Sequence, residues 1–72
     1  MKKFYAHTHS NSTGRTPYRT LKADNLTQAK RESRRLLGDG YLGHKILISE
    51  VIDGQRLEVA CATIGETGWT NL

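Results

Sequence analysis

Residues that commonly cross-link or anchor a small protein are scarce in this sequence. Cysteine occurs once, as Cys61, so no internal disulfide can form, and we expect a reducing compartment. No apolar run approaches the roughly 20 residues of a membrane-spanning helix. The basic start of the chain leads into polar residues, unlike a signal peptide. The sequence therefore predicts a soluble intracellular protein with no membrane partner.

The length of 72 residues limits the chain to one domain, because chains divide into separate domains only beyond roughly 250 residues. We therefore assign residues 1–72 to a single domain. Hydrophobic residues make up 36% of the chain and charged residues 25%, which is polar for a globular domain but leaves enough apolar clusters for a core. Such a core supplies only about 3–5 kcal/mol of stability.

Acidic residues are scarce in the first half of the chain. Residues 1–38 contain nine basic and two acidic residues, a local net charge of +7, whereas residues 39–72 contain two basic and five acidic residues, a net charge of −3. The basic half creates a field that attracts nucleic acid or an acidic protein surface. The plainer alternative is that the charge only keeps a small domain soluble.

Alternating apolar and polar residues predict two strands near the N-terminus. In residues 3–7, Phe4 and Ala6 share one face, as in a half-buried strand. The turn-rich segment 10–14 predicts a loop, after which residues 17–23 predict a second strand. We expect the single proline, Pro17, at the start of that strand, because proline cannot donate a ladder hydrogen bond.

One helix is expected over residues 25–37. Asn25 followed three positions later by Gln28 fits the capping-box pattern, and Gly38 ends the helix. Successive side chains of a helix lie about 100° apart, which gives this segment an apolar face and an adjoining basic face. The apolar face holds Leu26, Ala29, Ser33, Leu36 and Leu37, and the basic face holds Lys30, Arg31, Arg34 and Arg35. Because cations four residues apart repel each other, we expect the helix to hold them for an anionic partner.

Three further strands are expected in the C-terminal half. Residues 45–52 are largely apolar and β-branched, as in a central strand. The following Asp53-Gly54 predicts a type I′ hairpin turn, so residues 56–62 return antiparallel, and residues 69–71 form a short last strand. We expect three residues of the returning strand to face the helix: Leu57, Val59 and Cys61.

The predicted order is therefore β-β-α-β-β-β. We expect an α+β fold in which an antiparallel sheet of four or five strands carries the single helix on one face.

No residue pattern in the sequence supports catalysis. Cys61 lacks the orienting partners that a thiol nucleophile needs. The glycines after the helix do not open a helix, as a phosphate-binding loop would. The three histidines offer imidazoles, but structural zinc normally takes four ligands. We expect no enzyme activity, no metal, no cofactor and no small-molecule substrate.

Basic and aromatic residues around the second strand indicate a nucleic-acid surface. Tyr5 and Tyr18 are candidates for an aromatic platform that stacks single-stranded bases, although two tyrosines on a sheet face are common without that role. The candidates for nucleic-acid contact beside them are Arg15, Arg19 and Lys22.

Several short segments together resemble a known protein family. They are the helix start Asn25-Leu26-Thr27-Gln28-Ala29-Lys30-Arg31, the step Gly43-His44, the strand end Glu50-Val51-Ile52-Asp53-Gly54, and Trp69. This set resembles the small phage-encoded type I-F anti-CRISPR proteins, in particular the member with a five-stranded antiparallel sheet and one helix. The likeness runs in element order from about Leu21 to Leu72. The basic pair that precedes the family's tryptophan is absent from this chain.

The resemblance implies a non-catalytic inhibitor of CRISPR-Cas immunity in the bacterial host cytoplasm. Such a protein binds the crRNA-guided Cascade surveillance complex along its Cas backbone subunits and blocks hybridisation of target DNA, by mimicry of DNA or competition with it. Four residues fall on the family's binding helix: Gln28, Lys30, Arg31 and Arg35. Arg34 joins them through its charge. The alternatives are a small basic phage or prophage module that binds double-stranded DNA directly, and an accessory protein with another acidic partner.

Overall fold

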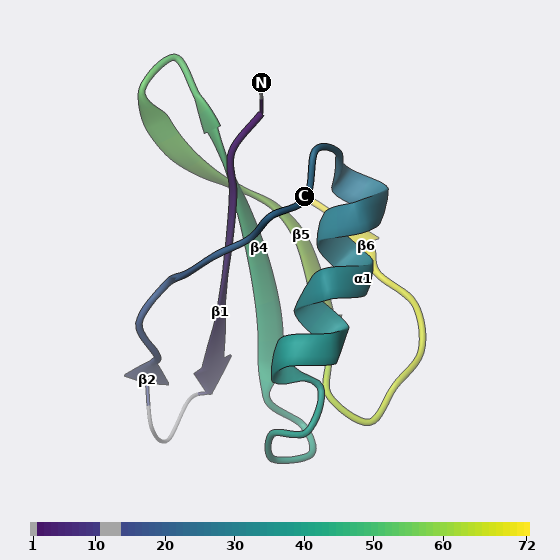
Figure 1. Cartoon of the computed structure of the whole chain (residues 1–72). Coiled ribbons are helices and arrows are strands. Elements are labelled where there is room, and N and C mark those ends of the chain that lie inside the picture. Colours follow the sequence, from purple (N-terminus) through teal and green to yellow (C-terminus); the bar gives the residue numbers. More distant parts are fainter. Residues whose placement is uncertain (1, 11–13) are drawn as a thin grey trace.

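The computed structural model describes residues 2–10 and 14–72, which form one antiparallel sheet with one helix packed on one face (Figure 1). The strands are β1 (Phe4–Ser10), β2 (Gly14–Arg15), β3 (Arg19–Thr20), β4 (Lys45–Ile52), β5 (Gln55–Thr63) and β6 (Thr70–Asn71), and the helix is α1 (Leu26–Leu37). The order across the six-stranded sheet is β2-β1-β4-β5-β6, with β3 also paired to β1. The predicted α+β class is confirmed. No helix of the described chain is long and apolar enough to cross a membrane.

The second predicted strand is broken into two short pieces, which is why the sheet has six strands. Both β2 and β3 pair with the same edge of β1, and Pro17 lies in the gap between them. Thr16 keeps the segment between β2 and β3 next to β1. Its N–H donates to the Thr8 carbonyl, and its Oγ1 accepts from the Thr8 N–H, each at 2.9 Å. The prediction that Pro17 starts one strand over 17–23 was therefore wrong. Of the predicted loop at 10–14, residues 11–13 lie outside the described residues.

Helix α1 has the predicted bounds and caps. The Asn25 side chain accepts a hydrogen bond from the Gln28 N–H at 2.9 Å, and the Gln28 Oε1 accepts from the Asp24 N–H at 3.1 Å. The buried Ser33 hydroxyl donates to the Ala29 carbonyl at 2.7 Å, so this polar group costs the core little. The sequence signals for the helix ends are thus confirmed.

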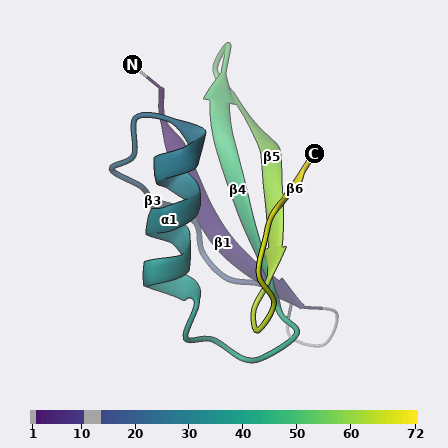
Figure 2. The ribbon, with the colours of Figure 1, turned by 90° about the vertical axis from the view of Figure 1, so that its right-hand side faces the viewer.

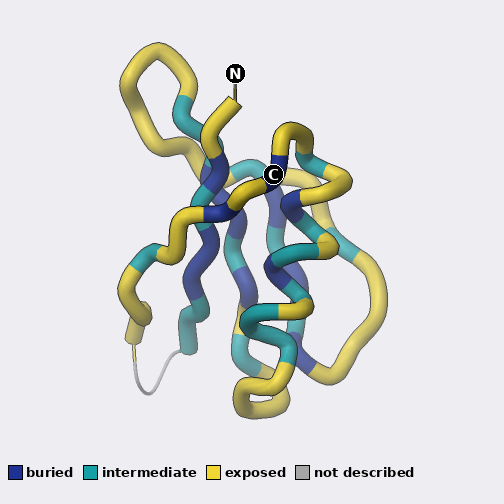
Figure 3. The backbone as a smooth tube through the Cα atoms, in the orientation of Figure 1, coloured by how far each residue is buried: buried dark blue, intermediate teal, exposed yellow. Residues whose placement is uncertain are grey.

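The core lies between α1 and the covered face of the sheet, as the buried stretches in Figure 3 show. Its buried members are Phe4, Ala6, Leu21, Ala23, Ala29, Ile48 and Ala60. Leu26, Leu36, Leu37, Val59 and Trp69 pack against them and remain partly exposed. Many of the buried residues are alanine, which lets the helix approach the sheet closely. Figure 2 shows α1 lying along this single face. The opposite face, which we call the open face, carries no helix.

The hairpin between β4 and β5 turns where the sequence predicts. Asp53 and Gly54 have φ angles of 52° and 80°, the two positive values that a type I′ turn requires. Ile52 pairs directly with Gln55 across the turn. The hairpin prediction is therefore confirmed in position and in turn geometry.

A bulge in β5 changes which of its residues face the helix. Ile48 pairs with Ala60 whereas Ser49 pairs with Glu58, so Val59 is an extra residue in the ladder. Side chains alternate between the two faces of the sheet along a strand. One extra residue therefore moves each later side chain to the opposite face.

The prediction that Leu57, Val59 and Cys61 face the helix is confirmed for Val59 and was wrong for Cys61. Ala60 and Ala62 are the buried residues of β5, and Cys61 lies between them on the open face. Val59 packs against the core from the bulge, and Leu57 is 44% exposed, before the bulge. The period-2 pattern was counted without the bulge, which explains the error.

Candidate binding surfaces

Two of the four cations of α1 contact the C-terminal segment. The Lys30 Nζ donates to the Asn71 Oδ1 at 3.1 Å. The Arg34 Nη2 donates to the Gly68 carbonyl at 2.8 Å, and its guanidinium lies 5.3 Å from the centre of the Trp69 ring. Lys30 and Arg34 therefore help to attach the helix to β6 and to the loop before it.

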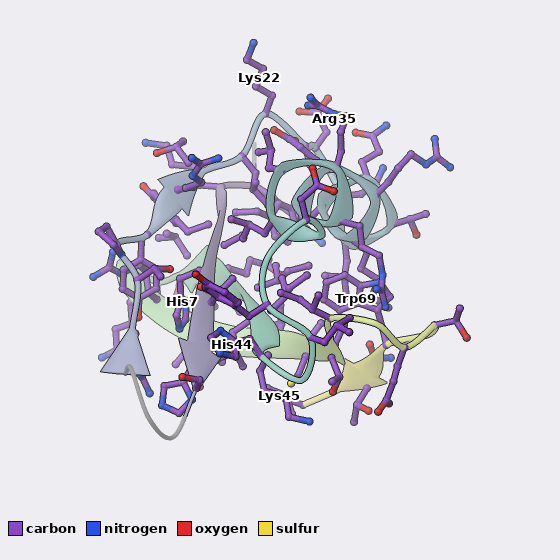
Figure 4. The ribbon with its side chains drawn as sticks, turned by 90° about the horizontal axis from the view of Figure 1, so that it is seen from below. His7, Lys22, Arg35, His44, Lys45 and Trp69 are labelled. Atoms are coloured by element: carbon purple, nitrogen blue, oxygen red, sulfur yellow. The ribbon has the colours of Figure 1, made fainter. Side chains whose placement is uncertain are left out.

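The other two cations of α1, Arg31 and Arg35, are exposed and one helical turn apart. In the described part of the chain, neither forms an ion pair. Figure 4 shows Arg35 and Lys22 projecting from the side of the molecule that faces away from the sheet. We call Lys22, Arg31 and Arg35 the outer cationic surface.

The acidic residue of α1 does not pair with these cations. Both carboxylate oxygens of Glu32 accept the backbone N–H of Lys22, each at 3.0 Å. This bond fixes the segment before the helix against the helix flank, and so it places the Lys22 side chain beside α1. The charges of the outer cationic surface remain mutually repulsive, at a cost of a few tenths of a kcal/mol for the pair one turn apart.

The structure does not bring the three predicted nucleic-acid contacts together. Arg15 lies in β2, and its Nη1 is 3.9 Å from the Glu58 carboxylate on the open face. Arg19 lies in β3 and lines an indentation of about 420 Å³ together with Leu37 from the end of α1. Lys22 belongs to the outer cationic surface, on the other side of the sheet from Arg15.

The two tyrosines predicted to form an exposed aromatic platform share the open face, but an arginine, Arg56, covers them. Tyr5 and Tyr18 are half-buried on the open face. The guanidinium carbon of Arg56 lies 4.0 Å from the centre of the Tyr18 ring and 5.7 Å from that of Tyr5. Arg56 was missed because it reaches the tyrosines only through the pairing of β1, β4 and β5, which no local sequence signal reveals.

His7 is fully buried beneath this cluster. Its ring centre is 4.5 Å from that of Tyr18, and its Nε2 is 3.8 Å from the Glu58 Oε2, too far for a hydrogen bond. Neither ring nitrogen has a hydrogen-bond partner among the described residues. Burial lowers the pKa of His7 below its usual value of 6.5, although the Glu58 carboxylate acts in the opposite direction. The neutral ring is therefore the form that the folded chain favours.

The other candidate groups for chemistry lie apart. Among the described residues, no group of three histidine, cysteine, aspartate or glutamate side chains is placed to hold a metal ion. Cys61 lines a cavity of about 230 Å³ whose wall also includes Lys45 and Trp69. The Lys45 Nζ donates to the Thr63 Oγ1 at 2.7 Å, so this amine is already engaged at the cavity rim.

Comparison with known protein families, curated proteins and solved structures finds no match. In the outer cationic surface, Arg31 and Arg35 are exposed and repel each other.

Proposed function

We propose that this chain is a non-catalytic inhibitor of CRISPR-Cas immunity that docks on the Cascade surveillance complex through its outer cationic surface. The observation that carries the proposal is the exposed pair Arg31 and Arg35, which lie one turn apart with no ion-pair partner in the described chain. A protein gains no stability from such a pair. Its presence is explained if a partner supplies the opposite charge.

The resemblance to type I-F anti-CRISPR proteins supports the same surface. An antiparallel sheet with one helix on one face is the fold that the resemblance implies, and this chain has that arrangement. The resemblance also assigns the binding role to the helix. Of the residues that it selects, Arg31 and Arg35 are the free contacts in this proposal. Lys30 and Gln28 keep the helix in place through Asn71 and Asp24.

Charge limits how a basic inhibitor engages this complex. The Cas backbone subunits hold nucleic acid, so their groove is itself basic and repels a cationic helix. Docking through Arg31 and Arg35 therefore requires acidic side chains near the groove, and shape and hydrogen bonds supply the rest of the contact. Part of the binding should weaken as the salt concentration rises.

The test is target-DNA binding by purified type I-F Cascade, with and without the protein. The variant is Arg31→Glu combined with Arg35→Glu. The control, Lys2→Glu with Lys3→Glu, reverses the same amount of charge at exposed positions outside the helix. We expect the native protein and the control to block target binding and the helix variant to lose the block. Equal inhibition by both variants removes α1 from the interface.

Direct binding of double-stranded DNA is the second candidate, because no acidic side chain of the described residues forms an ion pair with the outer cationic surface. A lane with protein and DNA alone, repeated over a salt series, distinguishes the two. The second function is favoured if Cascade still binds its target and the protein alone shifts DNA with a steep dependence on salt. A mutation that removes one phosphate contact should reduce the slope of log binding constant against log salt concentration by about one.

A further inference from the structure

The open face of the sheet carries more cations than acids. Directly paired residues of neighbouring strands point to the same face, and side chains alternate along each strand. The pairing registers therefore place four charged strand residues on the open face: Arg15, Lys45, Arg56 and Glu58. Three of these are cations and one is an acid, which gives the strands a net charge of +2 on this face. Charge of this sign attracts nucleic acid.

Arg56 is the outermost layer of a stack of side chains on the open face. Its guanidinium carbon lies 4.0 Å from the centre of the Tyr18 ring, and the Tyr18 ring centre lies 4.5 Å from that of the buried His7. Arg56 is exposed, and in the described part of the chain it forms no ion pair. One side of its guanidinium therefore contacts Tyr18, and the other side faces solvent.

This stack presents a flat surface that suits a nucleobase. Bases stack on guanidinium planes as well as on aromatic rings, and such contacts accept any base because every base has a π-face. Tyr18 already supports the guanidinium of Arg56 from below, so less conformational freedom is lost when a base binds. Tyr5 extends the surface along β1, because its ring centre is 5.7 Å from the same guanidinium carbon.

Arg15 supplies a cation for a phosphate beside this stack. Its side chain is 57% exposed, and its Nη1 lies 3.9 Å from the Glu58 carboxylate, too far for a hydrogen bond. The guanidinium of Arg15 therefore keeps its donors available for a phosphate. Glu58 is also 3.8 Å from His7, on which Tyr18 packs, so Arg15 and the Arg56 stack belong to one continuous surface.

We propose that the open face binds single-stranded nucleic acid, with a base stacked on the Arg56 guanidinium and a phosphate bound by Arg15. A duplex offers phosphates, but the faces of its bases are already stacked on one another. A single strand offers both a free base face and phosphates. Arg15 and Arg56 lie on the other side of the sheet from the outer cationic surface, so this site does not depend on the proposed function.

The test is fluorescence anisotropy of labelled oligonucleotides titrated with the full chain at low salt. The probes are oligo-dT and oligo-U of about 12 nucleotides and a DNA duplex of the same length. We expect the single strands to bind with a Kd of about 1–100 µM. The comparison of oligo-dT with oligo-U decides whether the strand is DNA or RNA. No binding of either single strand up to about 100 µM protein overturns the proposal.

The duplex measurement uses a chain whose outer cationic surface is neutralised, Arg31→Ala with Arg35→Ala. Duplex binding by those two arginines then does not contribute. We expect this variant to bind oligo-dT as the native chain does, and at least about fivefold more tightly than the duplex. Loss of oligo-dT binding in this variant, or equal affinity for the duplex, contradicts a site on the open face.

Arg56→Lys separates stacking from charge. Lysine keeps the positive charge but lacks the flat guanidinium, so oligo-dT binding should weaken at least about fivefold. Arg19→Lys is the matched control, because Arg19 is also exposed but pairs with Ala6, whose side chain points to the helix side of the sheet. Equal affinities of these two variants contradict the stack.

Tyr18→Leu removes the ring beneath the guanidinium and should weaken oligo-dT binding at least about threefold. Its matched control is Tyr41→Leu, because Tyr41 is 80% exposed in the loop after α1. Circular dichroism verifies that both variants remain folded. An affinity that Tyr18→Leu leaves unchanged contradicts the support of Arg56 by this ring.

Glu58 provides a test in the opposite direction. Among the described strands it is the one acid on the open face, and its carboxylate lies beside Arg15, where it repels a phosphate. Glu58→Gln removes the charge and keeps the size of the side chain. Oligo-dT binding should therefore tighten at least about twofold at low salt. Unchanged or weaker binding contradicts the phosphate contact of Arg15.

Discussion

Truncation of Ile48 to alanine measures how much the buried face of β4 contributes to stability. Ile48 is fully buried and lies opposite Ala6 on β1 and Ala60 on β5. The substitution removes a side-chain volume that two neighbouring alanines are too short to fill. Each buried methylene contributes about 0.8 kcal/mol, and the remaining cavity adds to the loss. We expect the free energy of unfolding to fall by about 3–4 kcal/mol.

That loss is nearly the whole stability of so small a domain, which is about 3–5 kcal/mol. Urea unfolding can be followed by the fluorescence of Trp69, the one tryptophan, which packs partly buried against the core. Leu42→Ala is the matched control, because Leu42 is 80% exposed and its truncation should change stability by less than about 0.5 kcal/mol. A loss below about 1 kcal/mol for Ile48→Ala would refute the assignment of the core.

Two further predictions concern pH and the helix start. Because burial lowers the pKa of His7 below 6.5, the unfolded chain binds this proton at higher pH than the folded chain. Stability should therefore be complete above about pH 6.5 and decline as the pH falls below it. His7→Gln, compared with the native protein by urea unfolding across that range, should show a smaller decline, and an identical decline contradicts the role of His7. Asn25→Ala removes the acceptor of the Gln28 N–H and should cost about 0.5–2 kcal/mol in thermal or urea unfolding. Asn25→Asp keeps that acceptor and should retain most of the stability.

Features that depend on neighbouring residues were predictable from the sequence. The Asn25 cap, the end of α1 and the Asp53-Gly54 turn each follow from a local residue preference, and each is present in the structure. The facing of Phe4 and Ala6 also follows from local alternation. These signals are sufficient for the α+β arrangement because they define the helix and the central hairpin.

Features that depend on distant pairing were not predictable. The gap at Pro17 and the bulge at Val59 become visible only in the pairing with β1 and β4. For the candidate surfaces, the helical repeat indicates that Arg31 and Arg35 share a row, but only the fold shows that Lys30 and Arg34 are engaged elsewhere.

The contacts of Lys30 and Arg34 also determine when, during synthesis, the helix becomes fully attached to the C-terminal segment. Their partners are 41 and 34 residues further along the chain, Asn71 and Gly68. During synthesis α1 leaves the ribosome well before these partners do, so the helix can form while its attachment to the sheet is still incomplete. The last attachment of the helix that carries Arg31 and Arg35 therefore depends on residues 68–71.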